Sequence, residues 1–279
     1  MEAGFKFTKM SGCGNDFIFL DHRDVPWNSW DLPKMARLLC RRRLSVGADG
    51  FVLLLPPEDP DNDFAWRFFN SDGSEAEMCG NAARCAARFA VVKGLVAKER
   101  MRFETISGVV EAQLTPRGAK IWMTEPKEMR PEITVILEEG AVEMAFLNTG
   151  VPHAVVFVED LEEIRVEDLG RKIRYHEAFY PKGTNVDFVQ MVGSQALAMR
   201  TYERGVEGET LACGTGAVAS AIAGHMRSMV RPPVTVKARG GELKIDFQFL
   251  GEGRYENVTL EGDARIIYEG IAWEEALLE

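Results

Sequence analysis

Two short stretches of the chain each place a cysteine and a glycine at the start of an alanine-rich segment. Residues 74–85 read SEAEMCGNAARC, and residues 208–219 read GETLACGTGAVA. Alanine-rich segments of this kind are typical of helices, so Cys79 and Cys213 are expected at two helix N-termini. The free N–H groups and the dipole of a helix start stabilise a thiolate and lower its pKa. A lone free cysteine is usually a small core residue, whereas two in matched contexts predict two thiols that serve one site.

The two glycines that follow the cysteines suit a ligand. The backbone at Gly80 and Gly214 is open to close approach by a ligand, and helix-start N–H groups suit a carboxylate.

Further polar residues lie where expected strands end. Taken singly, the other polar residues are typical of turns, a structural histidine or a surface ion pair. The candidates outside the two cysteine motifs are Asn15, Asn70, His153, Asn185, Glu203 and Arg204.

The elements that must position these residues are many short strands and few helices. Apolar or alternating runs bounded by Gly, Asp and Asn predict the strands, and helical spacing predicts helices over residues 32–43, 79–95 and 212–227. The last of these is apolar all round and must be buried. Pro126 and Pro131 predict a linker at residues 125–132, and residues 234–249 and 255–270 are interpreted as hairpins. Because both halves share this pattern, we predict an internal duplication.

Composition and charge exclude several classes of protein. The chain has 279 residues and a formal net charge of −10, and this negative charge does not favour binding to nucleic acid or to anionic membranes. Residues 41–43, three arginines, are interpreted as a solvated helix end. No apolar run reaches the roughly 20 residues of a membrane span, and the N-terminus does not resemble a signal peptide. The five cysteines are odd in number and lack a zinc-like spacing, so we expect reduced thiols, no metal and a cytoplasmic location.

Five motifs in order resemble the diaminopimelate epimerase family: KMSGCGNDF, NSDGSEAEMCGNAARC, GVPH, GTNVDF and ERGVEGETLACGTGA. The resemblance implies interconversion of LL-2,6-diaminopimelate and its meso isomer without a cofactor, in lysine and peptidoglycan precursor biosynthesis. It implies a mixed α/β fold of two pseudo-symmetric domains, each a barrel-like, mostly antiparallel sheet around a central helix. Residues 1–124 with 263–279 would form the domain carrying Cys79, and residues 125–262 the domain carrying Cys213.

The resemblance also implies roles for the candidate residues. Cys79 would act as base towards the LL isomer and Cys213 towards the meso isomer, because inversion needs a base on each face of the carbon. His153 and Glu203 would assist the thiols and the α-amino group. Backbone at Gly80, Asn81, Gly214 and Thr215 would hold the α-carboxylate, and Asn15, Asn70, Asn185 and Arg204 would bind the distal end. The family implies a homodimer with a small-molecule substrate and no metal.

The chain departs from the family pattern at two positions, and other functions stay open. Val151 stands where many relatives have asparagine, and Gly50 where a glutamine is frequent; Asn148 is a candidate replacement. Proline racemases and hydroxyproline epimerases have the same fold and two cysteines, but smaller substrates would not need the four distal residues. Residues 214–219, GTGAVA, also fit the Gly-x-Gly-x-x-Ala fingerprint of a nicotinamide-dependent oxidoreductase. A non-catalytic thiol or interaction protein is a third alternative.

Overall fold

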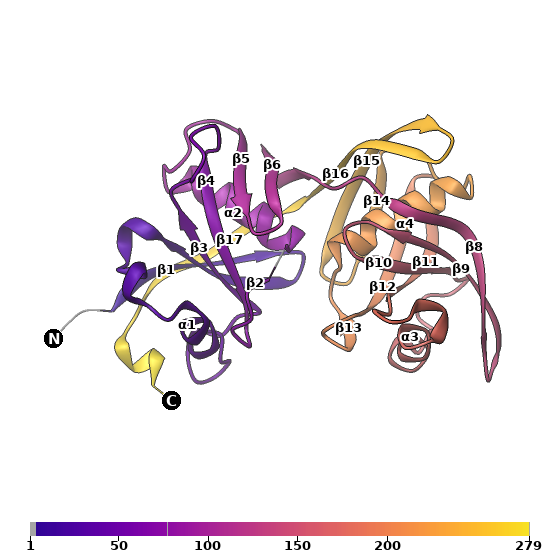
Figure 1. The fold of residues 1–279 in the computed structure, drawn as a ribbon, viewed down its shortest axis with the longest axis horizontal. Coiled ribbons are helices and arrows are strands. Elements are labelled where there is room, and N and C mark those ends of the chain that lie inside the picture. Colours follow the sequence, from indigo (N-terminus) through magenta and orange to yellow (C-terminus); the bar gives the residue numbers. More distant parts are fainter. Residues whose placement is uncertain (1–3, 77, 279) are drawn as a thin grey trace. The chain divides into compact units, whose positions relative to one another are not determined.

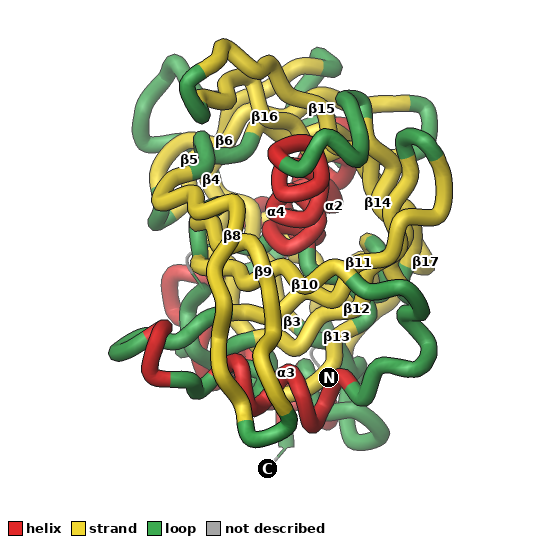
Figure 2. The backbone as a smooth tube through the Cα atoms, turned by 90° about the vertical axis from the view of Figure 1, so that its right-hand side faces the viewer, coloured by secondary structure: helices red, strands yellow, loops and turns green. Residues whose placement is uncertain are grey.

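The computed structural model describes residues 4–76 and 78–278, so Glu77, within the first cysteine motif, lies outside the described residues. The chain divides into two compact units. Unit 1 comprises the residues up to Ile121 and those from Gly262 onward, and unit 2 comprises Trp122–Glu261. Strands far outnumber helices along the described chain (Figure 2). The predicted α/β class, rich in sheet and poor in helix, is confirmed.

Unit 1 is a sheet with two α-helices (Figure 1). Neighbouring strands pair antiparallel except for β2 with β3 and β4 with β5, which are parallel. Each parallel step is a crossover that carries one of the α-helices. The elements are β1 (Phe5–Gly12), β2 (Asn15–Asp21), α1 (Leu32–Leu39), β3 (Gly50–Leu55), β4 (Phe64–Asn70), α2 (Gly80–Val92), β5 (Arg100–Thr105), β6 (Gly108–Thr115), β7 (Gly118–Trp122) and β17 (Arg265–Ala272), with the 3-10 helices η1 (His22–Asp24), η2 (Trp27–Ser29) and η4 (Glu274–Leu277).

Unit 2 repeats this order of pairings. β9 pairs antiparallel with β10, β10 parallel with β11, β11 antiparallel with β12, β12 parallel with β14, and β14 antiparallel with β15. The two parallel steps again carry one α-helix each. The elements are β8 (Lys127–Leu137), β9 (Gly140–Asn148), β10 (Pro152–Phe157), α3 (Val166–Arg174), η3 (Glu177–Phe179), β11 (Asn185–Gly193), β12 (Ala196–Glu203), β13 (Gly208–Thr210), α4 (Gly214–Met226), β14 (Val234–Ala238), β15 (Gly241–Gly251) and β16 (Arg254–Asp263).

The helices that follow the two cysteines are the central helices of their units. α2 and α4 are each 13 residues long. In α4 every residue from Gly216 to Gly224 is buried, and the helix contacts β9, β10, β11, β12, β14 and β15. α2 contacts β1, β2, β3 and β6 in the same manner. An apolar helix such as α4 is stable only when it is buried on all sides, which explains its place among six strands of unit 2.

Strand alternation separates two cores within each unit, because successive side chains point to opposite faces of a sheet. On β2, Ile18 and Leu20 pack with α1, whereas Phe19 contacts Phe89 of α2 with ring centroids 5.2 Å apart. On β10 and β11, Ala154, Val156, Val186 and Phe188 pack in one cluster with Val166 and Ile173 of α3. His153 and Asp187 occupy the alternate positions on these two strands and therefore face α4.

Two expected features of the chain path differ from the structure. The sequence predicts a linker at residues 125–132, yet residues 127–132 belong to β8. Pro126 precedes the strand, and Pro131 is tolerated within it because the pairing of β8 with β9 shifts register between Lys127 and Ile133. The interpretation of residues 255–270 as one hairpin is wrong as well, because β17 pairs antiparallel with β1, which completes the sheet of unit 1.

Two expectations about helices also need correction. α1 ends at Leu39, so residues 41–43 are not a helix end, and Arg42 is engaged in ion pairs. Helix α3 was missed because its apolar stripe is narrow; only Val166, Gly170 and Ile173 are buried. Among the described residues no helix is long and apolar enough to cross a membrane.

Candidate active site

Cys79 is the N-cap residue of α2. Its backbone is extended, at φ −144° and ψ 114°, and its carbonyl oxygen accepts the first helical hydrogen bond from the Ala83 N–H at 2.9 Å. The helix begins at Gly80, as the sequence predicts. Cys79 is half-buried, whereas the other four cysteines, Cys13, Cys40, Cys85 and Cys213, are buried.

A chain of side-chain hydrogen bonds fixes the first turn of α2. Asn81 Nδ2 donates to Asn15 Oδ1 at 2.6 Å, and Asn15 Nδ2 donates to Asp49 Oδ2 at 3.1 Å. On the other side, Arg84 Nη2 donates to Asn81 Oδ1 at 2.8 Å and to Cys13 Sγ at 3.2 Å. The predicted binding residues Asn15 and Asn81 are thus bonded to each other beside the Cys79 backbone.

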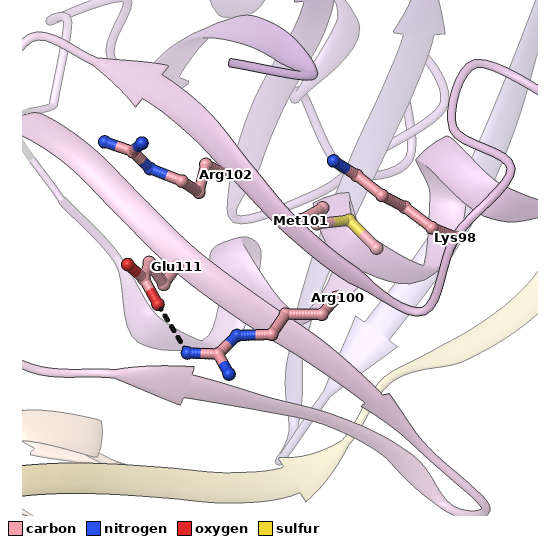
Figure 3. Close-up of a pocket in the computed structure, with 5 residues that line it drawn as sticks. All are labelled: Lys98, Arg100, Met101, Arg102 and Glu111. Carbon is pink, nitrogen blue, oxygen red and sulfur yellow. Dashed lines mark hydrogen bonds and ion pairs between the residues drawn. The ribbon is translucent and has the colours of Figure 1, made fainter. Parts of the chain in front are cut away.

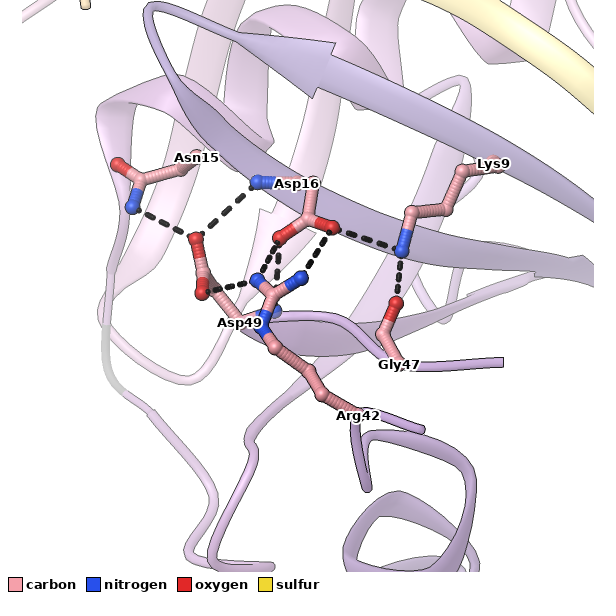
Figure 4. Close-up of polar contacts among 6 residues, drawn as sticks. All are labelled: Lys9, Asn15, Asp16, Arg42, Gly47 and Asp49. Atoms are coloured by element: carbon pink, nitrogen blue, oxygen red, sulfur yellow. Dashed lines mark hydrogen bonds and ion pairs between the residues drawn. The ribbon is translucent and has the colours of Figure 1, made fainter. Parts of the chain in front are cut away.

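Arg42 joins two carboxylates at the end of this chain (Figure 4). Its guanidinium group bonds Asp16 Oδ1 at 2.5 Å and Asp49 Oδ1 at 2.8 Å. Lys9 Nζ contacts Asp16 Oδ2 at 2.8 Å and the Gly47 carbonyl oxygen. Although burial raises the pKa of Asp16, the bonds from Arg42 and Lys9 outweigh it and hold this pKa below its usual value. The network orients Asp49, which in turn orients Asn15.

Asn70, the other predicted binding residue of unit 1, stands apart from this chain. It ends β4, is exposed, and donates from Nδ2 to Ser74 Oγ at 3.0 Å within a tight turn.

Cys213 is the N-cap residue of α4, with φ −117° and ψ 113°. Unlike Cys79 it is buried. Burial raises the pKa of Cys213 well above its usual value, and the nearby carboxylates of Glu203 and Asp187 raise it further. The expectation that a helix start lowers the thiol pKa is therefore wrong for Cys213, because desolvation outweighs the helix-start hydrogen bonds.

His153 connects Cys213 to a buried carboxylate. His153 Nδ1 lies 2.7 Å from Asp187 Oδ2, and both side chains are fully buried. His153 Nε2 lies 3.0 Å from Thr215 Oγ1, which lies 3.4 Å from Cys213 Sγ. Three predicted site residues, His153, Cys213 and Thr215, are thus brought together in unit 2.

Asn185 and Arg204 form a second group in unit 2. The Arg204 N–H donates to Asn185 Oδ1 at 2.8 Å, and Asn185 Nδ2 donates to the Pro152 carbonyl oxygen at 3.0 Å. The Asn185 amide therefore joins the start of β10 to the loop that carries Arg204. Glu203 ends β12 beside them, and burial raises the pKa of its carboxyl group.

The departure at Gly50 and the candidate replacement residue Asn148 have different surroundings. A side chain at Gly50 would not fit, because a Cβ there would lie 2.5 Å from the Phe68 ring and 3.0 Å from the Phe69 carbonyl oxygen. Asn148 is engaged in its own turn, where its Oδ1 accepts from the Gly150 N–H at 3.1 Å.

A hollow of about 270 Å³ lies on unit 1, lined by Lys98, Arg100, Met101, Arg102 and Glu111 (Figure 3). Arg100 pairs with Glu111 at 3.0 Å, and Lys98 pairs with Asp63 at 2.8 Å. None of the predicted site residues lines this hollow. Within residues 4–76 and 78–278, no group of three or more metal-binding side chains occurs.

Solved structures similar to this chain define its fold. A hydroxyproline epimerase from Agrobacterium vitis aligns with a TM-score of 0.70 at 18% identity, covering 97% of this chain and 93% of that one. A PhzF-family phenazine biosynthesis protein from Bacillus anthracis aligns with a TM-score of 0.72 at 14% identity, covering 97% and 99%. At such identities the likeness shows the fold alone. It is the fold of these epimerases and PhzF proteins.

Sequence comparison identifies the family. The family model described as diaminopimelate epimerase matches residues 7–129 and 145–266. A diaminopimelate epimerase from Aquifex aeolicus is 46% identical over 281 residues, covering 98% of this chain and 99% of the relative. One from a Hydrogenobaculum species is 42% identical, covering 95% and 97%. The chain belongs to the diaminopimelate epimerase family, which confirms the predicted family and enzyme class, an isomerase.

The sequence reasoning missed two buried charged residues next to the candidate site. Asp187 contacts His153, and Arg84 contacts Asn81; both are fully buried. Each carried a readable signal, because a charged residue within an apolar strand or an alanine-rich helix is rarely buried unless it is paired.

Proposed function

We propose that this protein interconverts LL-2,6-diaminopimelate and meso-diaminopimelate without a cofactor, using Cys79 and Cys213 as the two acid-base groups. The observation that carries the proposal is the repeated setting of the two cysteines. Each is the N-cap of a 13-residue central helix, in units with the same order of strand pairings. Family membership supplies the substrate.

The chemistry follows from the protonation states of two thiols. One cysteine as thiolate removes the α-proton, and the other as thiol delivers a proton to the opposite face. Burial raises the pKa of Cys213, which favours its thiol form at rest, the form that donates. The α-carboxylate would accept hydrogen bonds from the N–H groups at the starts of α2 and α4, which lie at Gly80, Asn81, Gly214 and Thr215.

The family resemblance assigns four residues to binding of the distal end of the substrate: Asn15, Asn70, Asn185 and Arg204. The contacts of Asn185 support a refined role, because both ends of its amide are bonded to backbone at Pro152 and Arg204. We assign Asn185 to the placement of Arg204, whose planar guanidinium group suits a carboxylate. Asn15 is held by Asp49 and Asn81, so it presents a fixed amide.

Proton NMR in heavy water tests the function directly. Reduced protein is mixed with LL-diaminopimelate, without pyridoxal phosphate, and the α-proton signal and the meso isomer are followed together. Loss of the signal with formation of the meso isomer is expected. Absence of exchange at either stereocentre, in folded and reduced protein, would contradict the proposal. Proline and hydroxyproline are then the substrates to test, as the same-fold alternative requires.

Three variants assign the thiols. Cys79→Ala and Cys213→Ala are each expected to abolish epimerisation, since inversion needs both groups. Cys40→Ala is the matched control, because Cys40 is buried in the cluster of α1 and β3, apart from both helix starts. The control is expected to keep its activity. Full epimerase activity in either site variant would refute the two-base mechanism.

The nicotinamide alternative does not fit the local structure. Gly214–Ala219 begins α4 and follows β13, a strand of three residues that pairs antiparallel with β12. A dinucleotide fingerprint instead follows a strand of a parallel sheet.

We also propose a cytoplasmic homodimer. The proposal of a dimer is supported by exposed apolar side chains at and after β17, with exposed fractions of 53% for Ile267, 55% for Ile271 and 59% for Trp273. An exposed apolar patch of this kind is typical of an interface. Light scattering on Ile271→Glu tests it, with a shift to the monomer mass expected and an unchanged dimer mass contradicting the assigned surface.

A further inference from the structure

The contacts of His153 form one continuous line in unit 2. Asp187 Oδ2 lies 2.7 Å from His153 Nδ1, and Thr215 Oγ1 lies 3.0 Å from His153 Nε2 and 3.4 Å from Cys213 Sγ. The line joins three elements, since His153 is on β10, Asp187 on β11, and Thr215 in the first turn of α4. Register explains why it forms, because β10 and β11 run parallel and place both residues on the α4 face.

The directions of these hydrogen bonds are set by what each group can donate. The Thr201 hydroxyl donates to Asp187 Oδ1 at 2.6 Å, which leaves Asp187 Oδ2 to accept from His153. An ionised carboxylate only accepts, so Nδ1 of His153 carries the hydrogen. In a neutral imidazole Nε2 is then an acceptor, the Thr215 hydroxyl donates to it, and the Thr215 oxygen is left to accept from the Cys213 thiol.

We propose that Asp187 is a positioning residue that fixes the tautomer of His153, and that Cys213 exchanges its proton with His153 through the Thr215 hydroxyl. The proposal rests on the proposed function for the use that the thiolate is put to. Its geometry lies wholly within unit 2.

The proton transfer balances within the line. The Cys213 S–H bond breaks as a new O–H bond forms on Thr215, while the original Thr215 O–H bond breaks as an N–H bond forms at His153 Nε2. The result is a Cys213 thiolate and a His153 imidazolium, whose charge the Asp187 carboxylate neutralises. Reversal of the same two transfers restores the thiol.

The surrounding residues hold the Asp187 side chain in place and bury it from solvent. Both Asp187 and His153 are fully buried. Gly216, in the first turn of α4, lies against the carboxylate so closely that a Cβ there would be 2.4 Å from Asp187 Oδ1. Thr149 Oγ1 donates to the Thr215 carbonyl oxygen at 3.0 Å and so fixes the backbone that carries the hydroxyl. The other titratable group that faces Cys213 is Glu203 of β12.

Nitrogen-15 NMR of the histidine rings tests the tautomer in the protein without substrate. The chain has four histidines, and His153→Gln identifies the signals of His153. We expect a protonated Nδ1 and an unprotonated Nε2 at neutral pH. In Asp187→Asn, the Asn oxygen accepts from Thr201 and its amide hydrogens face Nδ1, so the tautomer is expected to invert. A wild-type His153 protonated at Nε2 and bare at Nδ1 would overturn the proposal.

Kinetics test the transfer through Thr215. Thr215→Val removes the hydroxyl and keeps the shape, and kcat is expected to fall about 10²-fold with KM little changed. Asp187→Asn is expected to lower kcat by about 10³-fold, because the wrong tautomer cannot accept the proton. Thr215→Ser restores the hydroxyl and is expected to recover most of the rate.

Ser220→Ala is the matched control on the same helix. Ser220 is buried, and its hydroxyl donates only to the Gly216 carbonyl oxygen at 2.7 Å. It is expected to stay within about threefold of the wild-type rate, well below the effect of a lost proton-transfer group. Equal rates for Thr215→Val and Ser220→Ala would overturn the transfer step.

The two arms separate the two hypotheses. If the wild-type protein does not epimerise diaminopimelate, the proposed function fails, while the histidine spectra still decide the tautomer and the role of Asp187. If it epimerises and the spectra show the opposite tautomer, the function stands and the line through Thr215 fails.

Discussion

Arg84 is a charged residue inside the core of unit 1, and its replacement gives a quantitative prediction. The side chain is fully buried. Its guanidinium group donates to Asn81 Oδ1 at 2.8 Å, to Cys13 Sγ at 3.2 Å, and to the carbonyl oxygens of Gly80 and Asp263 at 3.3 Å. We consider Arg84→Leu, which places an apolar side chain at the position and removes all four hydrogen bonds.

The expected loss of stability is about 3 kcal/mol. A hydrogen bond to a charged group contributes about 1.5–3 kcal/mol, and only the bond to Asn81 is short. The remaining cost comes from Asn81 Oδ1 and Cys13 Sγ, which each lose a buried donor, and this places the total near the upper end of that range. The Gly80 carbonyl oxygen keeps its helical hydrogen bond from the Arg84 N–H. The Asp263 carbonyl oxygen loses the Arg84 Nε donor, whereas the Asp263 carboxylate keeps its partners, Arg265 at 2.6 Å from Oδ2 and the Cys13 N–H at 2.7 Å from Oδ1.

Urea unfolding followed by tryptophan fluorescence measures the effect in the right unit. Four of the five tryptophans, Trp27, Trp30, Trp66 and Trp273, lie in unit 1. Arg88→Leu is the matched control, since Arg88 lies one turn further along α2 and donates to a single carbonyl oxygen, that of Ala264. It is expected to cost less than about 1 kcal/mol. Equal unfolding midpoints for the two variants would refute the reasoning.

Three further outcomes are expected. The N–H groups of Glu58 and Asp59 and the Asn62 amide bond Glu104 and lower its pKa. This stabilisation is therefore complete above the usual glutamate pKa and is lost as the pH falls through the lowered value. Amide exchange of Glu58 and Asp59, measured relative to the intrinsic rate at each pH, should lose its protection there, and protection that does not depend on pH contradicts the prediction. In Gly216→Ala, the Asp187 carboxylate must move by about 1 Å to reach ordinary contact with the new Cβ, so we expect a large fall in kcat. The melting temperature should stay close to wild type, because the gain in helix propensity of about 1 kcal/mol offsets the strain. An unchanged kcat would contradict this prediction. Iodoacetamide at pH 8 should modify Cys79 before the buried cysteines, as followed by peptide mass spectrometry. Burial raises the pKa of Cys13 to about 11 and of Cys40 to about 12, which leaves little of the reactive thiolate at these positions. Equal labelling of Cys40 would argue against the prediction.

Pattern in the sequence was sufficient where one physical effect decided the structure. Residues 214–226 are apolar on every side, and such a segment has no stable place except the centre of a unit. The two glycines after the cysteines likewise mark the helix starts that the structure has at Gly80 and Gly214.

Competing effects defeated the sequence reasoning elsewhere. Pro126 and Pro131 indicate a break, but β8 begins directly after Pro126 and accommodates Pro131 by shifts of register that no local pattern shows. The helix-start argument predicted a lowered thiol pKa, yet at Cys213 the sign depends on burial and on carboxylates from β11 and β12. The sequence reasoning also missed Asp187, which lies within the apolar strand β11. Its partner, His153, lies 34 residues away in the sequence and is brought to it only by the tertiary structure.

The repeated order of strand pairings bears on how the two halves have diverged. At the start of β2 and the end of β4, unit 1 carries Asn15 and Asn70; at the corresponding ends of β10 and β12, unit 2 carries His153 and Glu203. At these strand ends one copy of the scaffold thus carries two neutral amides where the other carries an imidazole and a carboxyl group. A symmetric pair of identical halves would have to present the same residues twice. Joining the copies in one chain allowed each to change alone at these positions, while both kept a cysteine at the start of the central helix.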